Sequence, residues 1–96
     1  MTDLCTKINE FGKAMGNASR YRIIEALLKG EKTVGELVKI VHLTQPAVSQ
    51  HLKTLKTSNL VTDERRGQEV YYSVDAPYIL GLLKSLTTDV RTRKKN

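Results

Sequence analysis

The chain has 96 residues, of which 40% are hydrophobic and 27% are charged, as expected for one small globular domain over residues 1–96. Sixteen basic against ten acidic residues give a net charge of +6, which favours a polyanionic partner such as nucleic acid, although solubility alone also explains such a surplus. No apolar run approaches the ~20 residues of a membrane span, and residues 1–9 show no signal-peptide pattern. A single cysteine, Cys5, excludes an intrachain disulfide, which favours the reducing cytoplasm. Because there is also no membrane span, we expect a cytoplasmic protein with no membrane partner.

The N-terminal third of the chain is predicted to form two helices. The first covers residues 3–15, where apolar side chains recur at helical spacing, at Leu4, Ile8, Phe11 and Met15. Asn17 or Ser19 can cap a second helix over residues 20–29, and Gly30 is expected to stop it.

Residues 33–57 match the pattern of a helix-turn-helix. Thr33 and Glu36 have the spacing of a capping box, and the helix that they begin carries apolar residues at Val34, Leu37, Val38 and Val41. After a connection of two residues, Thr44 is a good N-cap for the next helix. Pro46 in the first turn of that helix costs little, because amides there lack intrahelical partners in any case.

The helix that follows Thr44 has two different faces. Val48, Leu52 and Leu55 form a narrow apolar stripe that has to pack against the rest of the domain. The opposite face is polar but nearly uncharged, with Pro46, Gln50, Lys53, Thr54 and Thr57 flanked by Ser49. An ordinary solvated face more often carries Glu/Lys pairs. Amides, hydroxyls and one ammonium group instead suit a helix that reads base edges in a DNA major groove.

The C-terminal part changes period. Residues 60–62 and 70–74 are β-branched and aromatic runs, and together with the intervening Arg66-Gly67-Gln68 they predict a hairpin over residues 60–74. A last helix is expected over residues 76–90, with Ile79, Leu82, Leu83, Leu86 and Val90 on one face. The basic residues of 91–96 are predicted to form a frayed, solvated tail.

A helix-turn-helix followed by a hairpin predicts a winged helix, a mainly α (α+β) fold with about five helices and a two-stranded wing. On the recognition helix, Gln45 and Gln50 can make bidentate contacts to adenine. Ser49 can donate or accept a hydrogen bond, and Lys53 can bind phosphate or guanine. Pro46 can pack on a thymine methyl group, and Lys56 is expected to meet phosphate or solvent.

The wing offers a second set of candidate DNA contacts. Arg65, Arg66 and Gly67 are expected at the DNA backbone or in the minor groove. The alternative is a hairpin that keeps two arginines for solubility, since Asp63 and Glu64 dilute the local charge.

The apolar stripes of the first and last helices are longer than the core of one small domain requires. In a two-fold homodimer both stripes can pack against the partner's, through Leu4, Ile8, Phe11, Ile79, Leu82, Leu83 and Leu86. Such a dimer would place two recognition helices about one turn of DNA apart, on a pseudo-palindromic double-stranded operator. The alternative is that both stripes only cover the core of the monomer.

Taken together, these segments resemble the ArsR/SmtB family of bacterial winged-helix repressors over about residues 4–90. The motifs behind the resemblance are residues 17–24, 34–37, 45–52 (Gln-Pro-Ala-Val-Ser-Gln-His-Leu) and 67–73 (Gly-Gln-Glu-Val-Tyr-Tyr-Ser). The resemblance implies a homodimer joined by the first and last helices, which represses an operator until an inducer is sensed. It also implies base contacts at Gln45, Pro46, Ser49 and Gln50.

The chain departs from the family at the positions that bind metals. The segment that carries a thiolate pair in metal-sensing members corresponds to residues 31–37 here and contains no cysteine. The zinc positions of the last helix correspond to Ala76, Tyr78, Asp89 and Thr92, of which only Asp89 can be a ligand. We therefore expect no metal site and no cofactor, and the sequence names no inducer.

The remaining thiol and imidazoles give no stronger signal. Cys5 is interpreted as a small apolar residue of the first helix rather than as a redox or metal sensor, and the family's two-cysteine redox mechanism is excluded by count. His42 and His51 are interpreted as an incidental pair rather than as ligands.

The leading hypothesis is a homodimeric, sequence-specific transcriptional repressor. The alternative is a winged helix that docks on another protein. An enzyme is disfavoured, because no catalytic constellation or phosphate-binding loop is recognisable.

Overall fold

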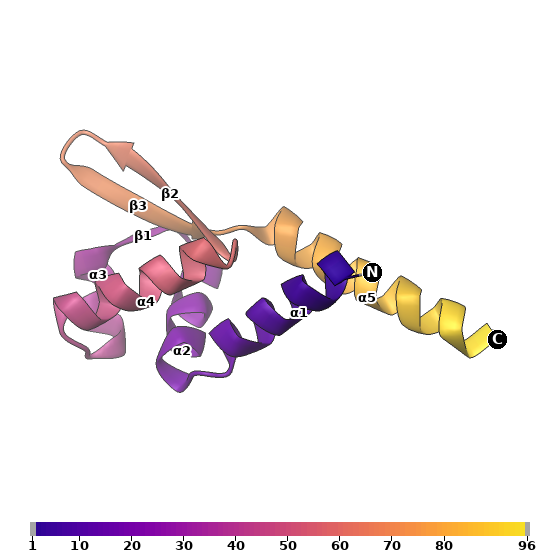
Figure 1. Cartoon of the computed structure of the whole chain (residues 1–96). Helices are drawn as coiled ribbons and strands as arrows, with labels where there is room; N and C mark the ends of the chain where they lie inside the picture. Colours follow the sequence, from indigo (N-terminus) through magenta and orange to yellow (C-terminus); the bar gives the residue numbers. More distant parts are fainter. Residues whose placement is uncertain (1, 96) are drawn as a thin grey trace.

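A computed structural model describes the backbone of residues 2–95 and the side chains of residues 3–88. Eight elements follow one another along the chain: α1 (Thr2–Met15), α2 (Ala18–Leu28), β1 (Lys32–Thr33), α3 (Val34–Val41), α4 (Gln45–Thr57), β2 (Val61–Arg66), β3 (Glu69–Val74) and α5 (Ala76–Lys95). Helices α2, α3 and α4 form a compact body, the β2–β3 hairpin projects from it, and α1 and α5 lie side by side at the other end (Figure 1). The predicted winged-helix fold is confirmed.

The helix-turn-helix forms because local signals at its ends agree with its apolar pattern. The capping box predicted for α3 is present, with the amide of Glu36 donating to Thr33 Oγ1 and the amide of Thr33 donating to Glu36 Oε1. His42 ends α3 in the left-handed conformation (φ 57°), which turns the chain sharply toward α4. The side chain of Thr44 then caps α4 by accepting from the amide of Ala47 at 3.3 Å.

The core lies where these helices meet the foot of the wing. Val48, Leu52 and Leu55 of α4 are at most 1% exposed. They belong to one apolar cluster with residues of α2, α3, the loop before β2 and the start of β2, namely Ile23, Leu27, Leu37, Val41, Leu60 and Val61. The apolar stripe predicted for α4 therefore fixes this helix to the body and leaves its other face outward.

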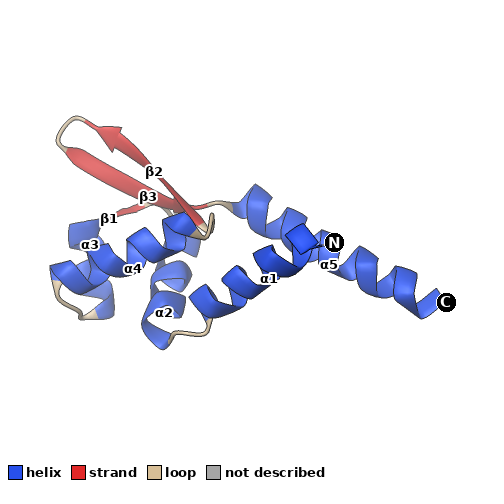
Figure 2. Cartoon of the chain, in the orientation of Figure 1, coloured by secondary structure: helices blue, strands red, loops and turns tan. Residues whose placement is uncertain are grey.

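The sheet differs from the prediction by a third strand. β2 and β3 pair as an antiparallel hairpin, and β1 pairs antiparallel with the other edge of β3, giving the order β1-β3-β2 (Figure 2). β1 comprises only Lys32 and Thr33, too short for any alternating pattern, and it was not predicted. The strands of the wing are also longer than predicted, since polar residues continue β2 to Arg66, and a two-residue turn at Gly67 and Gln68 closes the hairpin.

Two helix boundaries are corrected as well. α2 begins at Ala18 rather than Arg20, because Asn17 Oδ1 accepts from the amide of Arg20 and caps the helix there. The tail predicted to be frayed instead continues α5 through Lys95, and its side chains lie outside the described residues. None of the helices that the structure describes is long and apolar enough to cross a membrane.

Candidate nucleic-acid interface

The outward face of α4 presents the polar side chains that the sequence singled out. Gln45, Pro46, Ser49, Gln50 and Lys53 are all exposed on this helix. Within the described part of the chain, the side chains of Gln45, Ser49, Gln50 and Lys53 have no hydrogen-bond partner. Their donors and acceptors are therefore available to a ligand, and the buried stripe on the other side of α4 holds them in place.

Lys56 is engaged differently from the rest of this face. Its ammonium group lies 2.8 Å from Asp63 Oδ2, so the last turn of α4 is tied to the start of the wing. The hydrogen bond with Asp63 raises the pKa of Lys56. The predicted contact with phosphate would have to compete with this carboxylate.

The two arginines of the wing occupy opposite faces of the hairpin, because successive side chains of a strand alternate. Arg65 pairs in register with Val70, is exposed, and lies 3.4 Å from the carbonyl oxygen of Gly67 at the turn. Among the described residues it has no ion-pair partner. Its charge is available to a phosphate group.

Arg66 is held by two carboxylates. Its guanidinium group donates to both oxygens of Glu31, at 2.6 and 2.8 Å, and to Glu64 at 2.8 Å, and it lies 4.7 Å above the ring of Tyr71. We call these four residues the Arg66 cluster. The hydrogen bonds with Glu31 and Glu64 raise the pKa of Arg66, and the bond with Arg66 lowers the pKa of Glu31. The sequence did not reveal the Arg66 cluster, because Glu31 is 35 residues away along the chain.

Comparisons with known proteins agree with this geometry. The family profile described as "Bacterial regulatory protein, arsR family" matches residues 17–63. The transcriptional repressor SdpR of Bacillus subtilis is 32% identical over 68 residues, which cover 71% of this chain and 76% of that protein. The chain belongs to the arsR family of bacterial regulatory proteins. The sequence-based resemblance is thereby confirmed.

Two further comparisons extend the match. The nodulation protein NolR of Rhizobium meliloti is 42% identical over 77 residues, which cover 80% of this chain and 63% of that protein. The transcriptional activator HlyU of Vibrio cholerae is 36% identical over 74 residues, covering 77% of this chain and 68% of that protein. The solved structure of V. cholerae HlyU superposes with a TM-score of 0.74, at 35% identity, over 90% of this chain and 97% of that one.

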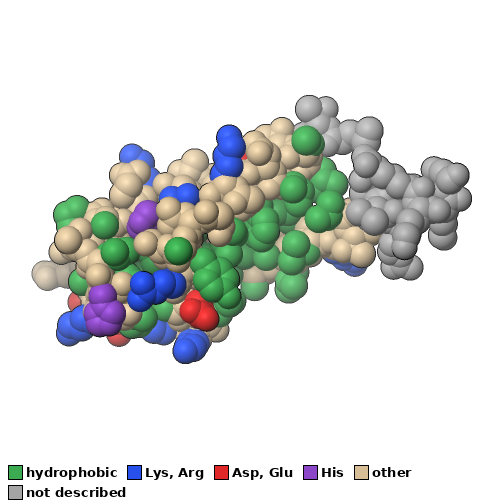
Figure 3. Space-filling model, turned by 90° about the horizontal axis from the view of Figure 1, so that it is seen from below, with side chains coloured by type: hydrophobic (Ala, Val, Ile, Leu, Met, Phe, Trp, Pro, Cys, Tyr) green, Lys and Arg blue, Asp and Glu red, His purple; other side chains and the backbone are tan. Residues whose placement is uncertain are grey.

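In this arsR-family chain the predicted dimer residues fall into two groups. Phe11 and Ile79 pack on the core and Leu82 is 5% exposed, while Leu4 and Ile8 are half-buried, so these five already have contacts within the monomer or are partly covered. Leu83 and Leu86 of α5 are exposed, at 41% and 37%. Leu80, which sequence reasoning missed, is 66% exposed and joins them. Figure 3 shows hydrophobic side chains gathered toward the end of the molecule that α1 and α5 form.

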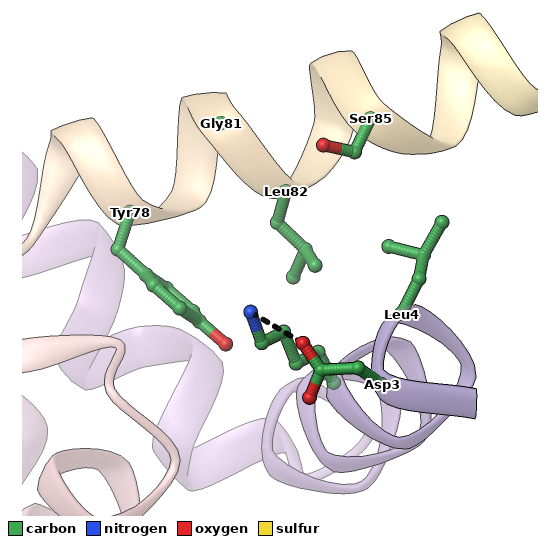
Figure 4. A pocket seen from close by; sticks show the side chains of 7 residues that line it. Asp3, Leu4, Tyr78, Gly81, Leu82 and Ser85 are labelled. Carbon is green, nitrogen blue, oxygen red and sulfur yellow. Dashed lines mark ion pairs between the residues drawn. The ribbon is translucent and has the colours of Figure 1, made fainter. Parts of the chain in front are cut away.

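A hollow of about 490 Å³ lies between α1 and α5. Figure 4 shows Tyr78 and Leu82 pointing from α5 toward α1, where the carboxylate of Asp3 accepts from the ammonium group of Lys7 at 3.1 Å. The two charges pair with each other, and this bond raises the pKa of Lys7. The same helix α5 carries the exposed leucines.

The candidate metal positions are arranged as follows. Ala76 and Tyr78 lie in the first turn of α5, whereas the side chains of Asp89 and Thr92 lie outside the described residues. In the region whose side chains are described, no three His, Cys, Asp or Glu residues come together in a group that could hold a metal ion. Cys5 is exposed on α1.

Proposed function

We propose that this arsR-family chain is a sequence-specific, DNA-binding transcriptional regulator of the cytoplasm, and that its recognition element is the outward face of α4. The observation that carries the proposal is the row of amide, hydroxyl and ammonium groups on that face, which are unpaired among the described residues. Gln45 and Gln50 would bind adenine edges, Ser49 would bind a neighbouring base, and Pro46 would pack on thymine methyl groups.

The flanking cations would fix the register of the protein on the duplex. Lys53 and Arg65 are exposed and have no ion-pair partner among the described residues, which suits them to phosphate groups. The Gly67 turn would approach the DNA backbone closely. We assign Lys56 and Arg66 a smaller share, because each already has carboxylate partners.

The active form is proposed to be a homodimer that binds a pseudo-palindromic operator. One face of α5 exposes three leucines to solvent, Leu80, Leu83 and Leu86, which is unfavourable. Burial of this face in a dimer would enlarge the hydrophobic core of a small chain. A two-fold axis through this face would present two α4 helices to one side of a duplex.

Repression is the direction that we propose for regulation. SdpR is a transcriptional repressor, whereas HlyU is a transcriptional activator, so relatives of this chain act in both directions. A dimer bound over its operator keeps other proteins off that stretch of DNA, so repression needs only the DNA-binding and dimer surfaces described above. Among the residues whose side chains are described, no ligand set supports a metal-sensing role.

In vitro selection from a random duplex library tests the proposal directly. We expect enrichment of one pseudo-palindromic sequence, with half-sites about 10 base pairs apart from centre to centre. Failure to enrich any sequence would contradict sequence-specific binding. The alternative of a protein-docking winged helix predicts a partner whose affinity changes little with salt, whereas DNA affinity falls steeply with salt.

A further inference from the structure

One guanidinium group links the helices α1, α2 and α4. Arg20, in the first turn of α2, donates from Nε to the carbonyl oxygen of Ala14 at 2.8 Å and from Nη2 to that of Lys13 at 3.1 Å. Both carbonyls belong to the last turn of α1. On its other side, Nη1 lies 3.4 Å from Nδ1 of His51, in the middle of α4. We call these four residues the Arg20 joint.

The chemistry of the joint suits an arginine in particular. The last carbonyls of a helix have no intrahelical partner and carry a partial negative charge, which a cation neutralises. A guanidinium group has donors on several sides and no acceptor, so His51 Nδ1 has to be the unprotonated nitrogen of a neutral ring. Burial, assisted by the charge of Arg20, lowers the pKa of His51 and so favours that neutral form.

The position of the joint matters because α4 is the proposed recognition helix, while α1 packs against α5, the helix of the proposed dimer contact. α1 packs on α2 and α5, while α4 packs on α2, α3 and β2. The Arg20 side chain spans from the end of α1 to the middle of α4. In the proposed dimer the contact is made by α5, on which α1 packs. The angle between α1 and α4 therefore affects the spacing of the two recognition helices, which has to match about one turn of DNA.

We propose that Arg20 is a positioning residue for DNA recognition, which fixes the recognition helix α4 relative to α1, the helix that packs against the proposed dimer helix α5. The DNA part of this inference rests on the proposed function. Arg20 itself does not contact DNA in this arrangement, since its donors are directed at Lys13, Ala14 and His51.

The first test compares two conservative substitutions on α2. Arg20→Lys keeps the positive charge but cannot reach α1 and α4 together, while Arg22→Lys alters an exposed residue of the same helix. On a duplex selected by the wild-type protein, Arg20→Lys should bind about tenfold more weakly, which corresponds to roughly 1.4 kcal/mol. Arg22→Lys should bind like the wild type, and both variants should keep the wild-type molecular mass in solution.

A double-mutant cycle separates positioning from simple capping of α1. His51→Ala should weaken DNA binding, and adding Arg20→Lys to it should cost little more, because the same link is already broken. Wild-type affinity in Arg20→Lys would overturn the proposal. So would a loss that adds fully to that of His51→Ala, because Arg20 would then act on α1 alone.

Amide hydrogen exchange tests the link made by Arg20 without any DNA. It therefore still applies if no duplex is selected, an outcome that would contradict the proposed function but not this link. Arg20→Lys should then speed amide exchange in α4 and in the last turn of α1 relative to Arg22→Lys. Unchanged exchange in α4 would overturn the inference.

Discussion

Both carboxylate oxygens of Glu31 accept hydrogen bonds from Arg66, at 2.6 and 2.8 Å, and thereby connect the loop before β1 to the end of β2. Arg66 crosses the face of the central strand β3, lying over Tyr71, to reach its partner. The charge of this arginine is matched by Glu31 and Glu64, whereas that of Arg65 has no such match among the described residues. Two neighbouring arginines of the wing therefore differ in ion pairing, and we propose that they differ in role.

Replacement of the two wing arginines should separate these roles. Arg65→Gln should lower the slope of log affinity against log salt by about one, as expected when one phosphate contact is lost. Arg66→Gln should leave that slope nearly unchanged, because its charge is already compensated. Fluorescence anisotropy with a selected duplex over a series of salt concentrations measures both slopes. An equal loss of slope in the two variants would show that Arg66 also meets phosphate.

The leucine face of α5 can be tested by placing a charge on it. Leu83→Glu should convert the dimer into a monomer, because it would bury an unpaired carboxylate at the centre of the proposed contact. Leu28→Glu is the matched control, since Leu28 is more exposed (68%) but lies on α2. Light scattering after size-exclusion chromatography gives the mass of each variant. A dimeric Leu83→Glu protein would contradict the proposed interface.

The lowered pKa of His51 predicts that the stability of the protein depends on pH. Its pKa in the folded protein is lowered, first by burial and then by Arg20, so the unfolded chain binds a proton more readily than the folded one. The contribution of His51 to the free energy of unfolding is fully present above its ordinary pKa of about 6.5. It is lost as the pH falls through the lower pKa of the folded protein. The melting temperature should therefore fall more between about pH 7.5 and about pH 5.5 in the wild type than in His51→Gln. Equal falls would show that His51 is not the group responsible.

The conformation of Gly67 at the turn of the wing predicts that its replacement lowers thermal stability. Gly67 has φ +64°, which costs other residues roughly 1 kcal/mol, and a Cβ at this position would meet no other atom within 4 Å. Gly67→Ala should therefore lower the melting temperature through backbone strain alone, by about 4–8 °C for a domain of this size. Gly35→Ala in α3 should leave it unchanged or raise it, because alanine favours helix there. A thermal melt followed by circular dichroism compares the two.

Local signals in the sequence were sufficient to predict most of the helix-turn-helix and the wing. Thr44 and Pro46 mark the start of α4, and Gly67 marks the turn of the hairpin, because caps and turns depend on residues close in sequence. The exposed face of α4 followed from helical periodicity in the same way.

Features that depend on distant residues were not predictable. The pair of Glu31 and Arg66 needs β1 beside β3, and β1 is too short to show a pattern. Whether Leu80 or Leu82 faces outward depends on how α5 packs against α1, and neighbouring positions on the helix differ only in that packing. Tertiary contacts thus determine partners of charged and apolar residues that the local sequence pattern cannot identify.

The central claim, that the outward face of α4 reads DNA sequence, is tested most directly by Gln50→Ala. The measurement is the ratio of affinities for a selected duplex and for a duplex with the adenines of its half-sites replaced, at one fixed salt concentration. We predict that Gln50→Ala reduces the difference in binding free energy between the two duplexes by roughly 1–3 kcal/mol, which lowers the ratio of affinities. The affinity for the altered duplex should stay nearly unchanged. An unchanged ratio, with both affinities equal to those of the wild type, would contradict the account.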